Sequence, residues 1–266
     1  MAVWFITGAV RGIGHRVARE ALRRGHRVVA TDRDLAAVTE AFAGMGGEVL
    51  PLELDLMRPQ APTAAVEQTM RRFGRIDVLV HDVARTVRAP LRDTTDAQAR
   101  ALFDINVVGM LAVARAVLPV LSAQQAGRII VVGSAAGFSA PAGSGLYGAS
   151  MAAVEALCET FRAELEEFGV CVTVVELGRF ATLPPAFDRG SLAPGDPRKA
   201  AVAILDLLTV DDPPLRLQLG ADAVAHVEAK LEHVAQELDL WRPVSLSTAS
   251  DHDLPRQNGH RPPEGE

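Results

Sequence analysis

The sequence has few cysteines and no metal-binding pattern. Cys158 and Cys171 are the only cysteines in 266 residues, and each lies inside an apolar segment. Two isolated cysteines exclude a disulfide framework, and no group of His, Cys and Asp residues has the spacing of metal ligands. We therefore expect buried, reduced thiols and no bound metal.

Long hydrophobic runs and basic stripes are also missing. No run approaches the 18 apolar residues of a membrane span, and Met1 leads into an apolar segment without a charged leader. The 27 basic and 33 acidic residues give a net charge of −6, and no basic stripe carries interleaved aromatic residues. These absences argue against nucleic acids and membranes as partners and predict a soluble, cytoplasmic protein.

Length and composition indicate one globular domain. With 48% apolar residues, a chain of this length can bury one large core. Strand-like and helix-like segments alternate to about residue 240 without a linker, so we expect one domain over residues 1–244. Residues 245–266 are polar and rich in Pro and Gly, which predicts a disordered tail.

The alternation of segments predicts the fold class. Short apolar runs indicate about seven strands, and segments with apolar residues at helical spacing separate them. This order implies right-handed crossovers and an α/β fold with one Rossmann-type, doubly wound parallel sheet and helices on both faces. The predicted strands are residues 3–7, 27–31, 48–54, 76–80, 128–133, 170–176 and 215–219, and the predicted helices after the first are residues 35–43, 61–73, 96–122, 146–168, 197–208 and 221–240.

The first predicted strand leads into a glycine-rich turn. Gly8, Gly12 and Gly14 follow the run Val3–Thr7, and a helical pattern begins directly after them. Glycines let the backbone turn sharply and approach a pyrophosphate, which the free amides of a helix N-terminus attract. We expect a dinucleotide site here, with the spacing G-x-x-x-G-x-G in place of the more familiar G-x-G-x-x-G.

Asp32 follows the second predicted strand and bears on the choice of coenzyme. A carboxylate at this place accepts hydrogen bonds from the adenosine ribose and repels a 2′-phosphate, which favours NAD over NADP. Arg11 and Arg33 favour the opposite choice, because a guanidinium pairs with that phosphate. The alternative role of Asp32 is to cap the helix that begins at Leu35.

A set of residues with a specific order and spacing runs along most of the chain. The set is Thr7-Gly8-x-x-x-Gly12-x-Gly14, Asp55, Asn106, Ser134 and Tyr147. In this order and spacing the chain resembles the short-chain dehydrogenase/reductase family, from residue 1 to about residue 240. The segment Tyr147–Glu155 resembles the start of the family's Tyr-Ser-Ala-Ser-Lys helix.

The resemblance implies hydride transfer between a nicotinamide and a carbonyl or alcohol carbon. It implies that Ser134 bonds the substrate oxygen, that Tyr147 exchanges a proton with it, and that Asn106 holds a water in a proton relay. It places Asp55 at the adenine, and it implies a homodimer or homotetramer, since members commonly pair through their two long central helices. The implied cofactor-binding residues are Thr7, Gly8, Arg11, Gly12, Ile13, Gly14, Asp32, Asp55, Tyr147 and Gly178.

Met151 is the first departure from the family pattern. The family has a lysine there, one helical turn after the tyrosine, which bonds the nicotinamide ribose and lowers the tyrosine pKa. A thioether does neither, and Lys199 and Lys230 belong to later elements. An unperturbed phenol has a pKa of about 10, so about one molecule in a thousand is phenolate at pH 7.

The second departure follows the fourth predicted strand. His81-Asp82-Val83-Ala84 stands where the family has Asn-Asn-Ala-Gly, and a milder change puts Leu177-Gly178 in place of Pro-Gly. We hypothesise that His81 supplies the positive charge or the proton that Met151 cannot. The alternative is a histidine that is satisfied by structural contacts.

Three functions remain open at this point. The first is an NAD(P)-dependent oxidoreductase that works mainly as a reductase, because a neutral phenol donates a proton without prior deprotonation. The second is a catalytically silent relative that keeps nucleotide binding, and the third is a non-redox isomerase or dehydratase. For the first, we expect moderate-sized apolar carbonyl substrates and a substrate lid in the loop 180–192.

Overall fold

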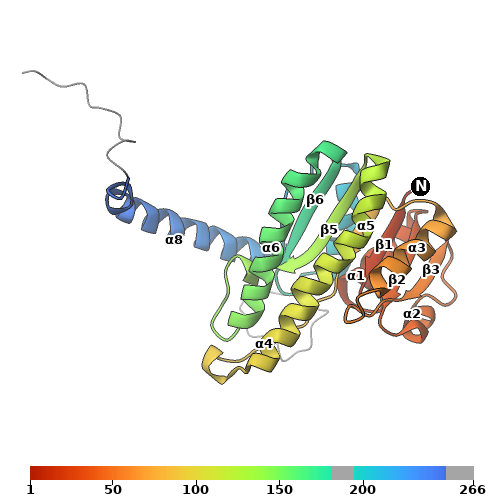
Figure 1. The fold of residues 1–266 in the computed structure, drawn as a ribbon, viewed down its shortest axis with the longest axis horizontal. Helices are drawn as coiled ribbons and strands as arrows, with labels where there is room; N and C mark the ends of the chain where they lie inside the picture. The colour runs from red at the N-terminus through yellow and green to blue at the C-terminus, as the bar shows by residue number, and fades with distance from the viewer. Residues whose placement is uncertain (181–194, 250–266) are drawn as a thin grey trace, which may run out of the picture. The chain divides into compact units, whose positions relative to one another are not determined.

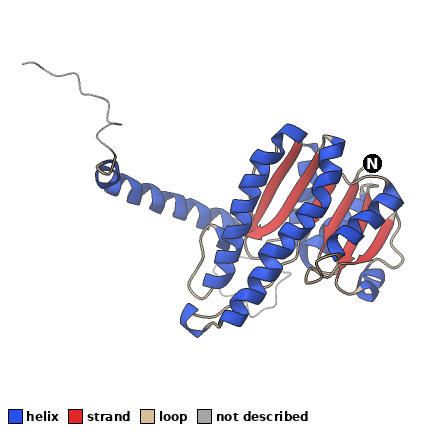
Figure 2. Cartoon of the chain, viewed as in Figure 1, coloured by secondary structure: helices blue, strands red, loops and turns tan. Residues whose placement is uncertain are grey.

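The protein forms two compact units in a computed structural model that describes residues 1–180 and 195–249. The units are residues 1–227 and 228–266. In the first unit, one sheet lies between two layers of helices, as Figures 1 and 2 show. The predicted α/β fold is therefore confirmed.

The sheet contains seven strands, and all of its pairings are parallel. Their order is β3-β2-β1-β4-β5-β6-β7, so the winding reverses between β1 and β4. In doubly wound sheets the ligand binds beyond the carboxyl ends of the strands at this reversal. The strands are β1 (Val3–Thr7), β2 (Arg27–Asp32), β3 (Val49–Glu53), β4 (Val78–His81), β5 (Gly127–Ser134), β6 (Val170–Leu177) and β7 (Arg216–Leu219).

Helices cover both faces of this sheet. Helices α3, α5 and α6 contribute to the core on one face, and α1 and α7 to the core on the other. The helices are α1 (Gly12–Arg23), α2 (Leu35–Ala41), α3 (Ala61–Phe73), α4 (Asp96–Phe103), α5 (Met110–Gln124), α6 (Gly145–Leu165), α7 (Pro197–Asp206) and α8 (Ala221–Leu246).

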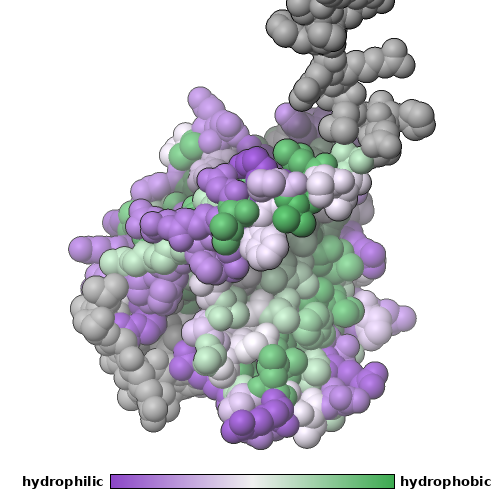
Figure 3. Space-filling model, turned by 90° about the vertical axis from the view of Figure 1, so that its left-hand side faces the viewer, coloured by the Kyte–Doolittle hydropathy of each residue, from purple (hydrophilic) through white to green (hydrophobic). Residues whose placement is uncertain are grey.

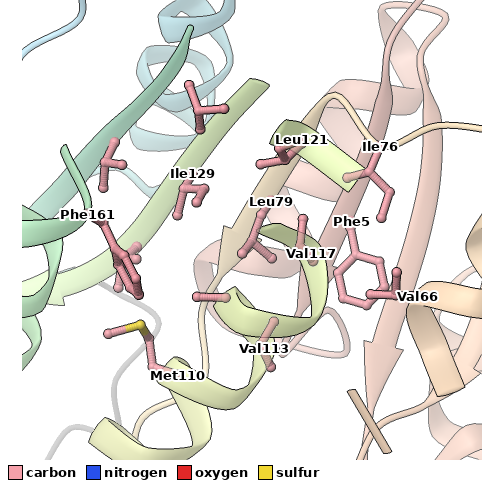
Figure 4. Packing of buried hydrophobic residues seen from close by; sticks show 14 of the residues in the cluster. Phe5, Val66, Ile76, Leu79, Met110, Val113, Val117, Leu121, Ile129 and Phe161 are labelled. Carbon is pink, nitrogen blue, oxygen red and sulfur yellow. The ribbon is translucent and has the colours of Figure 1, made fainter. Parts of the chain in front are cut away.

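Strand β1 supplies both cores because its side chains alternate between the two faces. Phe5 packs on one side with Val66 of α3 and Val117 of α5 (Figure 4), while Trp4 and Ile6 pack on the other. Burial on both faces explains why β1 is apolar throughout. Packing on both faces therefore fixes the end of β1, from which the glycine turn starts.

The long helix predicted over residues 96–122 is divided in the structure. A π-helical turn, Asp104–Gly109, separates α4 from α5. Counted together across the π-helical turn, Asp96–Gln124 is the only helical stretch of the described residues that is long and apolar enough to cross a membrane. Val113 and Val117 of this stretch are buried against the sheet, as in the core helix of a globular domain.

Helix α8 differs from the expectation for residues 221–240. It runs to Leu246, beyond the predicted end at residue 240, and Ala223 is its only buried residue, so this helix adds little to the core. The boundary between the two units falls within α8, after Val227. The proposed domain limit at residue 244 stays a prediction, and residues 250–266 of the expected tail lie outside the described residues.

Both cysteines are free thiols in the structure. Cys158 is buried in α6 and Cys171 is half-buried in β6. Burial raises the pKa of the Cys158 thiol to about 12, so this side chain is an unreactive core residue.

Candidate active site

The carboxyl ends of the parallel strands bring the predicted site residues to one edge of the sheet. Thr7 at the end of β1 lies beside Thr31 of β2 and His81 of β4. At the end of β5, Ser134 lies beside Leu177 of β6. Residues from five separate strands therefore face the same ligand-binding edge.

The glycine turn after β1 adopts the backbone conformation that its glycines allow. Gly8 has φ +68° and Gly12 has φ +72°, a region that side-chain-bearing residues rarely occupy. A Cβ on Gly8 would also collide with the backbone carbonyl of Asp82. Arg11 stands at the N-cap of α1 and makes no capping hydrogen bond with its side chain. The turn thus presents the start of α1 to an anion.

Asp82 lies directly beneath this turn. Its Oδ2 accepts a hydrogen bond from the Gly14 amide at 2.5 Å, and its own amide donates to the Thr7 hydroxyl at 3.1 Å. Burial raises the pKa of the Asp82 carboxyl to about 7, and the Gly14 hydrogen bond offsets part of that rise. A carboxylate that ionises near neutral pH therefore occupies one amide at the amino end of α1.

His81 does not act as the cation that the sequence suggested. Its side chain is buried, and its Nδ1 lies 3.1 Å from the Thr7 hydroxyl. Burial lowers the pKa of His81 to about 4, with a smaller opposing effect from the Val83 backbone. A neutral imidazole at physiological pH supplies no positive charge, which opposes the first part of the hypothesis, while the supply of a proton by His81 stays a prediction. His81 instead helps to join β4 to β1.

Asp32 and Asp55 follow the adjacent strands β2 and β3. Asp32 is half-buried, and its Oδ1 accepts a hydrogen bond from the Arg33 amide at 2.8 Å. Asp34, rather than Asp32, caps helix α2 by accepting two backbone amides, so the alternative role of Asp32 is wrong. Asp55 accepts the Met57 amide at 3.0 Å. Both carboxylates lie at the edge where an adenosine would be bound.

Ser134 and Tyr147 come together from β5 and the first turn of α6. Burial raises the pKa of the Tyr147 phenol above its usual value; a hydrogen bond with Ser134 offsets part of this, and the charge of Asp82 raises the pKa further. Arg88 has the smallest effect, and it lowers the pKa. Tyr147 is therefore a neutral phenol at physiological pH.

Asn106 lies buried in the π-helical turn and holds the backbone next to the site. Its Oδ1 accepts from the Arg85 amide at 2.7 Å, and its Nδ2 donates to the Arg85 carbonyl and to Ser150 Oγ, both at 2.9 Å. Ser150 Oγ donates in turn to the Tyr147 carbonyl at 2.8 Å. This chain of hydrogen bonds fixes the helical turn that carries the phenol. Sequence reasoning missed Ser150, although it stands in the segment that resembles the family's tyrosine helix.

Met151 belongs to the hydrophobic core and is almost fully buried. A Cβ placed on Gly137 would lie only 3.0 Å from the Met151 Cβ, so α6 packs closely on the turn after β5. The Met151 side chain packs in the hydrophobic core at the sequence position of the family's lysine. No charge from this position reaches Tyr147.

Gly178 stands just after β6, where the chain passes close to the start of α8. Its amide donates to the Leu219 carbonyl at 2.9 Å. A Cβ there would overlap the carboxylate of Asp222, which accepts a hydrogen bond from the Arg179 amide at 2.8 Å. The close approach of the Asp222 side chain is therefore compatible with a glycine at this position. The expected lid, apart from Phe180, lies outside the described residues.

Comparison with known proteins gives consistent matches. The family model described as short chain dehydrogenase matches residues 2–184. Oxidoreductase BOA17 of Botryotinia fuckeliana is 30% identical over 93% of this chain and 99% of its own length. A Mycobacterium tuberculosis protein, named uncharacterized NAD-dependent oxidoreductase Rv0687, is 32% identical over 65% of this chain and 69% of its own length.

Solved structures match over most of the chain. A short-chain dehydrogenase from Streptomyces avermitilis has a TM-score of 0.87 and 32% identity, covering 94% of this chain and 98% of its own. An alcohol dehydrogenase from Thermococcus sibiricus, complexed with 5-hydroxy-NADP, has a TM-score of 0.73 at 24% identity, covering 82% of this chain and 96% of its own. The second likeness concerns the fold alone.

Proposed function

Because the chain belongs to the short-chain dehydrogenase/reductase family and is an NAD(P)-dependent oxidoreductase, we propose that it works mainly as a reductase of carbonyl compounds. The observation that carries this direction is the state of Tyr147. Its pKa is raised by burial and by the charge of Asp82, and Met151 supplies no cation to lower it. A phenol that stays protonated is an acid, and carbonyl reduction requires an acid.

The residues at the sheet edge fit a dinucleotide coenzyme. Gly8 and Gly12 give the turn its left-handed backbone, the amino end of α1 attracts a diphosphate, and Asp32 suits the ribose hydroxyls. When bound, the coenzyme supplies the hydride. Asp82 is the residue that fits least well, because its carboxylate already bonds the Gly14 amide.

The protein's own residues handle the proton. A hydrogen bond with Ser134 lowers the pKa of Tyr147, and we propose that Ser134 holds the substrate oxygen beside the phenol. Tyr147 then donates its proton to the oxygen as negative charge develops there. In the reverse reaction Tyr147 must first lose that proton, and with an ordinary phenol pKa of about 10 the ionised fraction at pH 7 is about one in a thousand. The oxidation is therefore expected to be the slower direction near neutral pH.

We favour NAD over NADP as the coenzyme. Asp32 ends β2 as a half-buried carboxylate, which repels a 2′-phosphate, and the Mycobacterium tuberculosis relative carries an NAD-dependent name. Arg11 and Arg33 are exposed and oppose this choice in principle. We further propose a cytoplasmic homodimer or homotetramer that acts on moderate-sized apolar carbonyl compounds and binds neither nucleic acid nor membrane.

The test compares both directions of the reaction on purified protein. Reduction of a panel of apolar aldehydes and ketones with NADH or NADPH is measured from pH 6 to 9, beside oxidation of the matching alcohols. We expect reduction to dominate, and Tyr147→Phe to lose at least about a hundredfold of it, as for a positioned acid. Ordinary rates of alcohol oxidation near pH 7, without a preference for reduction, would oppose the proposal.

A second candidate, a silent relative that only binds nucleotide, is favoured by Met151 and by the Asp82 carboxylate at the turn. Fluorescence titration with NADH separates the two. Tight binding without turnover on any carbonyl compound favours the silent relative. Binding with turnover favours the reductase, and the absence of any binding opposes both.

A further inference from the structure

Helix α8 carries an apolar stripe with heptad spacing. From Val224 to Trp241 its larger apolar residues follow one another at alternating intervals of three and four residues, which is the spacing of the a and d positions of a coiled coil. The residues of this stripe are Val224, Val227, Leu231, Val234, Leu238 and Trp241. We call them the α8 seam.

The seam is exposed to solvent over most of its length. Every residue from Leu231 to Ala249 is exposed, and Leu238 and Trp241 expose 54% and 59% of their surfaces. Exposed hydrophobic residues stand among hydrophilic ones on the face that Figure 3 shows. A single helix in water gains little from such a stripe, whereas a partner helix would bury it.

Charged residues beside the seam specify one partner. Lys230 and Glu237 occupy equivalent flanking positions, one heptad apart. In an antiparallel pair of identical helices with Leu231 opposite Val234, Lys230 of each copy faces Glu237 of the other. The twofold symmetry repeats this attraction, and no like charges meet. The same register sets the large Trp241 opposite the smaller Val224.

We propose that the α8 seam pairs with the α8 seam of a second copy of this chain, as an antiparallel two-stranded coiled coil. Pro243 agrees with this arrangement, because it lies beyond the last seam residue and on the outer side of the heptad. The pairing is a separate association from the one expected through α5 and α6.

The first test measures the molar mass of the full-length chain by light scattering after size exclusion. Leu231→Glu combined with Leu238→Glu places charges in the seam, and we expect the mass to fall to half. Ala229→Glu combined with Gln236→Glu, on the outer side of the same helix, is the matched control and leaves the mass unchanged. Far-UV circular dichroism verifies that each variant is folded.

A charge exchange tests the direction of pairing. Lys230→Glu and Glu237→Lys should each raise the dissociation constant of the assembly several-fold, and the double variant should restore it. In a parallel pair Glu237 would instead face Arg242, and the double variant would not recover. An unchanged mass for the seam variant overturns the proposal. An unchanged mass with a lower melting temperature would indicate that the seam is covered by its own chain.

Discussion

The substitution Asp82→Asn tests the electrostatics of the site most directly. Asp82 is a half-buried carboxylate whose Oδ2 accepts the Gly14 amide, and burial raises its pKa to about 7. An asparagine has nearly the same shape, keeps an oxygen that accepts this hydrogen bond, and carries no charge. The variant therefore removes the cost of ionising the side chain and little else.

The expected gain in stability follows from the two pKa values. The ordinary pKa of this carboxyl is 3.8, and the folded value of about 7 is roughly three units higher. Each unit corresponds to about 1.36 kcal/mol, so ionisation in the folded state costs about 4 kcal/mol at most, and about 2 kcal/mol if water partly reaches the group. Because the folded pKa is raised, stability falls as pH rises from about 4 to about 7 and stays low above that.

Urea unfolding at several pH values measures this effect. At pH 8 we expect Asp82→Asn to raise the free energy of unfolding by about 2–4 kcal/mol, or the melting temperature by about 5–10 °C. The gain should shrink by more than half at pH 5 and vanish near pH 4. Asp34→Asn is the matched control, since Asp34 also accepts backbone amides at a helix N-terminus but is exposed. A pH-independent effect, or a destabilised variant at pH 8, would refute the reasoning.

Two further substitutions test other buried groups. Met151→Lys places a cation one helical turn from Tyr147 and should lower the phenol pKa by about 1–3 units. The rate of alcohol oxidation at pH 7 should then rise about ten- to a thousandfold, whereas the control Met151→Leu should leave this rate unchanged. Arg216→Met leaves two buried carboxylates unpaired, because Arg216 Nε lies 3.2 Å from Glu155 and 3.4 Å from Glu176. Burial raises the pKa of Glu155 to about 7. The free energy of unfolding in urea should therefore fall by about 3–5 kcal/mol at pH 8 and by less at pH 5.

The fold could be predicted from the sequence because each element carries its own local signal. The apolar run of β1 and the glycines at residues 8 and 12 have a periodicity and a conformational freedom that neighbouring residues do not alter. The same periodicity predicts helix α8. It does not predict that nearly all residues of this helix are left unburied. A heptad stripe has the same pattern whether it faces its own core or a second chain.

Only those site residues that stand at a specific spacing in the sequence could be predicted. Ser134 and Tyr147 were identified by their separation, and the structure brings them into hydrogen-bonding contact. The partners of Asn106 were not predictable, because the π-helical turn that aims it at Ser150 arises from tertiary packing and has no local signature. The lowered pKa of His81 was not predictable for the same reason, because burial, which lowers it, is a property of the folded chain.

The two departures from the family pattern act on Tyr147 in the same direction. Met151 replaces a cation that would lower the pKa of the phenol, and Asp82 introduces a negative charge that raises it. Each change keeps the pKa of the phenol high, and the two effects add. One change removes a positive charge near the Tyr147 hydroxyl, and the other adds a negative charge there. Ser134, Ser150 and the glycine turn stay in place, which random loss of catalytic residues would not be expected to achieve. Either change alone would also suit the silent relative, but their shared effect on Tyr147 supports the reductase that we propose.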